Sequence, residues 1–161
     1  MTHTSHLLIG MVGYLAWSSH TGGEAGLATL AAAGLGSLMP DIDHPDSQIG
    51  RLLWPISQPL ARLLGRRGVT HSLLLVAALA ALAHHLEPPS RELAVAFGIG
   101  YGLHIAADLL NQRGVALLFP LQARFRAPVT VRTGGAGEAV ITTLILGAAA
   151  VSIMGWAVLP F

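Results

Sequence analysis

Long apolar segments alternate with polar connections along the chain, and the apolar segments predict its helices. Five such segments cover residues 6–18, 24–39, 71–86, 92–110 and 138–159. The last two approach the roughly 20 residues that a helix needs to cross a bilayer. The other three are shorter and would need tilting or flanking turns to cross it. The pattern predicts an all-α fold, an integral membrane bundle of about five helices formed by one domain over residues 1–161.

Composition supports a membrane protein and narrows the chemistry. The chain is 53% hydrophobic and only 11% charged, whereas about a quarter of the residues in a soluble domain are charged. The net charge of +1 gives no reason to expect nucleic-acid binding. The sequence has no cysteine, which excludes disulfides and thiolate zinc ligands. Eight histidines beside eight acidic residues direct attention to metal binding.

The arginines predict how the helices cross the membrane. Two long connections, residues 40–70 and 111–137, carry four arginines each, and the ninth basic residue, Arg91, lies in a short turn. With five spans both long connections lie on one side, which the excess of positive charge assigns to the cytoplasm. The N-terminus then lies in the cytoplasm and the C-terminus outside. The first residues lack a positively charged stretch, so we expect no cleavable signal peptide.

Ionisable side chains gather at this cytoplasmic boundary. The stretch HIAAD places a histidine and an aspartate four residues apart, on one face of a helix. In a lipid-embedded helix an ionisable pair is costly and usually faces a polar interior with a functional role. The stretch PDIDHP crowds two aspartates and a histidine between prolines. Taken singly, these motifs also fit a buried hydrogen-bonded pair and a helix-ending turn. The residues expected at this boundary are His6, Asp41, Asp43, His44, His71, His104, Asp108 and Glu138.

These side chains suit divalent metal ions. Carboxylates with neutral imidazoles favour zinc, with Mn²⁺ or Mg²⁺ as harder alternatives. Eight groups exceed the needs of one tetrahedral ion, and two ions about 3.5–4 Å apart would suit hydrolysis of a phosphoester. Asp41 or Asp43 would bridge the ions or act as general base. Arg51, Arg67 and Arg126 could hold substrate phosphate, although each also fits a charge that only sets topology.

Several of these motifs resemble one family. The resemblance, to the YdjM/YbcI-type inner-membrane proteins, rests on the stretches MTHTSHLL, LMPDIDHPDSQIGRLL, ISQPLARLLGRRGVTHSLL and GYGLHIAADLLNQRGVALLFPL. That family is described as membrane-bound metal-dependent hydrolases, and its His, Asp and Glu pattern is distantly similar to that of zinc-dependent phospholipases C. The resemblance implies a bacterial inner-membrane protein whose eight boundary residues hold two or three divalent ions.

The leading functional hypothesis is a metal-dependent hydrolase that works at the cytoplasmic membrane surface. Its location suggests a phospholipid or another lipid-linked phosphoester as the substrate, so membrane lipids are the expected partners. One alternative is a non-catalytic structural or regulatory membrane protein whose metal holds the helices together. Another is a metal-ion transporter, but ligands at one boundary only argue against a path through the membrane.

Overall fold

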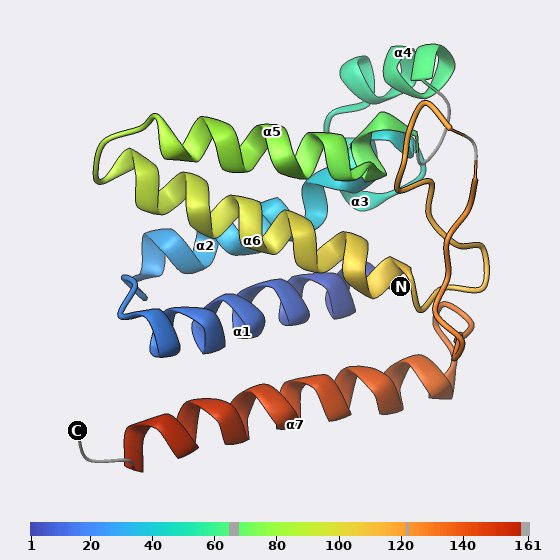
Figure 1. The fold of residues 1–161 in the computed structure, drawn as a ribbon. Helices are drawn as coiled ribbons and strands as arrows, with labels where there is room; N and C mark the ends of the chain where they lie inside the picture. The colour runs from blue at the N-terminus through green and yellow to red at the C-terminus, as the bar shows by residue number, and fades with distance from the viewer. Residues whose placement is uncertain (65–67, 122, 159–161) are drawn as a thin grey trace.

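The computed structural model describes residues 1–64, 68–121 and 123–158, and these are mainly helical (Figure 1). They form seven α-helices and two short 3-10 helices. The β-type pairing among these described residues consists of isolated bridges. The predicted all-α fold is confirmed. In chain order the elements are α1 (His3–Thr21), α2 (Leu27–Leu38), η1 (Met39–Asp43), α3 (Gln48–Leu52), α4 (Trp54–Leu64), η2 (Val69–His71), α5 (Leu73–His84), α6 (Ser90–Asp108) and α7 (Ala136–Val158).

Each of the five apolar segments forms a helix: α1, α2, α5, α6 and α7. Helix α6 packs most extensively against α2 and also contacts α1 and α5, whereas α7 packs against α1. The start of α1, the end of α6 and the start of α7 all lie at the same end of the molecule (Figure 1). The short elements η1, α3, α4 and η2 are at that end too, so the bundle has one structurally elaborate end.

Glycines allow α2 and α6 to approach closely. A Cβ on Gly36 would overlap the carbonyl group of Phe97, and one on Gly100 would overlap that of Ala33. Ala33 is completely buried between the helices. Small residues at such a contact let two backbones touch, as is common for helices in membranes.

The stretch 40–70 was expected to be a loop, but its described residues, 40–64 and 68–70, fold largely into η1, α3, α4 and η2. Pro40 opens η1, where a missing N–H does no harm. Ser47 caps α3 by accepting a hydrogen bond from the Gly50 amide at 2.9 Å. Helix α4 then packs against η1. The apolar pattern did not predict α4, because a proline within a segment usually indicates that it is not helical.

One helix among the described residues is long and apolar enough to cross a membrane by itself, over Ala136–Gly155. Helix α5 is apolar but has only 12 residues. Helices α1 and α6 have 19 residues each, but they bury polar side chains such as His6 and His104. Polar side chains at both ends of these helices, such as Ser18 of α1 and Glu92 of α6, lower their hydropathy.

Candidate metal centre

Five histidine and aspartate side chains meet at the elaborate end of the bundle. His6 comes from α1, Asp41 from η1, His71 from η2, and His104 and Asp108 from the last turns of α6. Four of them are buried, and Asp41 keeps 21% of its side chain exposed. Helix α6 brings its two residues together by their i, i+4 spacing, as the sequence predicted. The other three depend on the packing of α1, η1 and η2 around it.

The five side chains form two groups that share His104. One group is His6, His104 and Asp108, and the other is Asp41, His71 and His104; within each, the ligand atoms lie within 4.8 Å of one another. His6 Nε2 lies 3.3 Å from Asp108 Oδ1, and His104 Nε2 lies 3.9 Å from Asp41 Oδ1. Two ligands bound to one tetrahedral zinc ion at about 2.0–2.2 Å would be roughly 3.3–3.6 Å apart. Both groups therefore come close to the spacing of metal ligands.

The orientation of His104 also fits a metal ligand. Its Nδ1 lies 2.7 Å from the Ser37 carbonyl oxygen, which can only accept a hydrogen bond, so Nδ1 is the donor and Nε2 carries the lone pair. Among the described residues, Nε2 of His104 and Nε2 of His71 are buried without a hydrogen-bond partner. A histidine that donates to a backbone carbonyl through one nitrogen and offers the other is typical of metal sites.

Asp43 lies behind His71. Its Oδ2 is 3.6 Å from His71 Nδ1 and accepts a hydrogen bond from the Thr70 hydroxyl group. The Tyr101 hydroxyl group donates to the carbonyl of Thr70 and so holds η2 against α6. Asp43 therefore lies beside Nδ1 of His71. Asp41 lies at the other ring nitrogen, with its Oδ1 3.9 Å from Nε2. This placement gives the two aspartates different surroundings.

Glu138 and His44 lie outside the two groups. The buried Glu138 accepts hydrogen bonds from the Thr2 amide and hydroxyl groups, the Ser5 hydroxyl group and the Gly134 amide, at 2.6–2.9 Å. It joins the start of α7 to the start of α1, one turn from His6. The amino group of Met1 reaches the cluster at the same place, 2.8 Å from Asp108 Oδ1.

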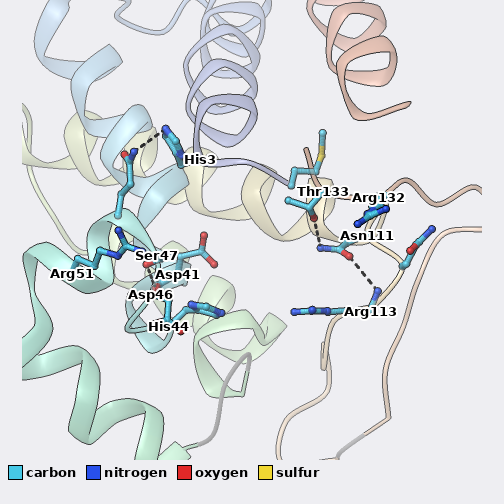
Figure 2. A pocket seen from close by; sticks show the side chains of 13 residues that line it. His3, Asp41, His44, Asp46, Ser47, Arg51, Asn111, Arg113, Arg132 and Thr133 are labelled. Carbon is cyan, nitrogen blue, oxygen red and sulfur yellow. Dashed lines mark hydrogen bonds between the residues drawn. The ribbon is translucent and has the colours of Figure 1, made fainter. Parts of the chain in front are cut away.

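A polar pocket of about 630 Å³ opens beside the cluster (Figure 2). Asp41 belongs to both, so it links the buried histidines with the open space. Figure 2 shows Arg51 on one side and Arg113 and Arg132 on the other. The residues that line the pocket are Met1, His3, Asp41, His44, Asp46, Ser47, Gln48, Arg51, Asn111, Gln112, Arg113, Arg132 and Thr133.

Of the two arginines selected from the sequence that the structure describes, Arg51 lines this pocket. Arg126 is exposed on the connection after α6 and does not line it. Arg67 lies outside the described residues. The sequence interpretation missed Arg113 and Arg132 because their proximity depends on how residues 109–133 fold back. Their shared connection was rich in arginine, which was the one available signal.

The fold and the cluster define a helical protein with a candidate metal centre at one end of its bundle. The chain belongs to the YdjM inner membrane protein family, whose model matches residues 1–160. The resemblance noted in the sequence is therefore confirmed.

The relatives agree with this membership. Inner membrane protein YdjM of Escherichia coli K12 and its namesake in Shigella flexneri are each 45% identical over 102 residues, covering 61% of this chain and 52% of theirs. The chain thus spans about half the length of these relatives. Protein YvsG of Bacillus subtilis is 31% identical over 141 residues, covering 88% of this chain and 87% of its own. No solved structure matches.

Proposed function

We propose that this protein is a membrane-embedded, metal-dependent hydrolase that cleaves a phosphoester of a membrane lipid. One observation carries the proposal: two His/Asp groups share His104 and open through Asp41 into a pocket that three arginines line. A metal site next to a cationic pocket is the arrangement that phosphoester hydrolysis needs.

The donor set supports binding of two divalent ions. His6 and Asp108 would hold one ion, and Asp41 and His71 the other; His104, which offers a single lone pair at Nε2, would complete one of the two sites. Three imidazoles and two carboxylates favour Zn²⁺, with Mn²⁺ or Mg²⁺ as alternatives. When bound, such an ion supplies Lewis acidity, which polarises a phosphoryl oxygen and acidifies water.

The surrounding residues suit the remaining tasks. Arg51, Arg113 and Arg132 line the pocket, where guanidinium groups would bind and orient phosphate oxygens by charge-assisted hydrogen bonds. Asp41, partly exposed to that pocket, is the carboxylate placed to meet both substrate and metal. Asp43, behind His71, is a positioning residue that fixes the imidazole ring.

A multi-pass arrangement with a cytoplasmic N-terminus accounts best for the polar end. The three pocket arginines lie on α3 and on the connection between α6 and α7, and both segments are at the end of the molecule where α7 begins (Figure 1). An excess of arginine marks the cytoplasmic side of membrane proteins. The cluster would then face the cytoplasm at the depth of lipid headgroups. A lipid phosphoester is the substrate within reach of such a site.

One observation favours a second candidate function, a structural metal clamp. The candidate ligands come from four separate elements, α1, η1, η2 and α6, so a bound ion would hold the end of the bundle together. A clamp needs the metal but no substrate. The arginine-lined pocket has no role in it, and this is why we favour the hydrolase.

Metal analysis combined with a hydrolysis assay separates the two functions. The protein would be purified in detergent, its metal content determined by mass spectrometry, and its activity tested on phospholipids in mixed micelles. We expect bound metal and turnover in the wild type, loss of both in His104→Ala, and neither loss in His84→Ala, which alters an exposed histidine at the far end of α5. Bound metal without turnover would favour the clamp. Absence of stoichiometric metal would refute both functions.

A further inference from the structure

The segment formed by α3 and α4 exposes a row of large apolar side chains. Leu52 is 76% exposed, Trp54 58%, Ile56 53% and Leu63 82%. Together with Pro59, Ile56 and Leu63 follow the i, i+3, i+7 spacing that places them along one face of α4. Water would be a poor solvent for this face.

The adjacent face of α4 is already packed against the protein. Ser57 is completely buried, and Leu60 lines an apolar cavity of about 350 Å³ with Met39 and Ile42 of η1. The apolar surface of the helix is therefore wider than the part that the protein covers. Ile56, Pro59 and Leu63 lie on the uncovered part.

Charge and location indicate what covers the exposed side. Residues 48–64 contain Arg51 and Arg62 but no acidic residue. Arg62 is exposed beside the apolar row, where its guanidinium group donates a hydrogen bond to Gln58 at 2.9 Å. Helix α4 lies at the end of the molecule where α7 starts (Figure 1), and the apolar span of α7 begins at Ala136. One membrane boundary would pass close to both.

We propose that α4 and Leu52 lie in the membrane interface, with the apolar row inserted among acyl chains and the arginines at the headgroups of anionic lipids. An apolar face edged by arginine, with a tryptophan near the headgroup level, is the composition of interfacial helices. A second copy docked through this patch about a two-fold axis would bring Arg62 towards its own counterpart. The charge pattern therefore favours lipid as the occupant.

Tryptophan fluorescence in vesicles tests the proposal without using metal or hydrolysis. Trp17→Phe and Trp156→Phe in the full chain leave Trp54 as the single reporter. The protein would be reconstituted into phosphatidylglycerol–phosphatidylethanolamine vesicles with bromine near the headgroup or near the chain ends. We expect shallow bromines to quench Trp54 about twofold and deep bromines to quench it less, because an interfacial helix lies about 5–10 Å into the boundary.

Two matched variants locate the contact. Leu63→Glu in the same single-tryptophan background should reduce the quenching, whereas Leu27→Glu, at an equally exposed leucine 87% accessible at the start of α2, should not. Quenching of Trp54 by aqueous iodide but not by brominated lipid would overturn the proposal. So would efficient Leu63→Cys crosslinking between two copies with no bromine effect, since that would assign the patch to a dimer.

Discussion

Substituting Gly100 with alanine should disturb the candidate metal centre without changing any candidate ligand. The new methyl group would overlap the Ala33 carbonyl oxygen and lie 2.8 Å from the carbonyl carbon. Neither atom can rotate away, because both belong to the backbone of α2. Restoring a carbon–carbon contact of about 3.5 Å would move the helices apart by at least roughly 0.7 Å, and relieving the overlap with the oxygen would move them further.

That movement acts directly on His104. Its Nδ1 donates to the Ser37 carbonyl on α2 at 2.7 Å, and a separation of about 0.7 Å would stretch the bond beyond its ordinary range. Loss of such a partner typically weakens metal binding by about 10–100-fold. Overpacking itself should cost about 1–3 kcal/mol of stability.

Gly102→Ala is the matched control, because nothing lies within 4 Å of its added methyl group. Both variants gain the same helix propensity of alanine over glycine, about 1 kcal/mol, so the difference between them isolates the contact with α2. Zinc affinity would be measured by chelator competition and thermal stability in the same detergent. Equal affinity and equal melting temperature for Gly100→Ala and Gly102→Ala would refute the proposed link between helix packing and the metal centre.

Three further perturbations test the surrounding network. Glu138→Gln replaces the charged acceptor of the Gly134 amide and should lower the free energy of unfolding by about 1.5–3 kcal/mol. The melting temperature should fall below that of the control Glu24→Gln, and equal melting temperatures would contradict a structural role for Glu138. Asp43→Asn should lower metal affinity about 10–100-fold yet recover turnover in excess metal, whereas Asp41→Asn should not recover, and identical rescue of both would contradict their separate placements. Removing metal with a chelator should lower the melting temperature, and Zn²⁺ at about 100 times its dissociation constant should restore about 2.7 kcal/mol; unchanged melting would show that the site holds no metal.

The five apolar helices were predictable because a run of apolar residues can be recognised from the local sequence alone. All five apolar segments form helices, with ends shifted by a few residues. Pairing of His104 with Asp108 also followed from helical periodicity alone. The helices within 40–70 were missed because prolines and short length remove the periodic signal, and cap residues such as Ser47 resemble ordinary turn residues.

The pocket depended on long-range packing. Arg113 and Arg132 are 19 positions apart, and they line one space because the Val131 amide donates to the Leu110 carbonyl at 2.8 Å. A parallel bridge between Asn111 and Val131 belongs to the same turn of the chain. No local pattern encodes that return. The sequence could indicate an arginine-rich connection, but not which arginines meet the cluster.

Hydrogen bonding distinguishes the carboxylates that the sequence could only group together. Glu138 accepts from three donors at the start of α1 and from the Gly134 amide, and Asp43 accepts from Thr70 behind His71. Asp41 and Asp108 instead present oxygens to the buried nitrogens of His71 and His104. The donors to Glu138 match the roughly four lone pairs of a carboxylate, and Asp43 lies on the side of the His71 ring away from Asp41. These two residues therefore serve best by fixing α1 and His71. The acids that crowd one boundary therefore divide between those that would hold metal and those that hold the metal's ligands in place.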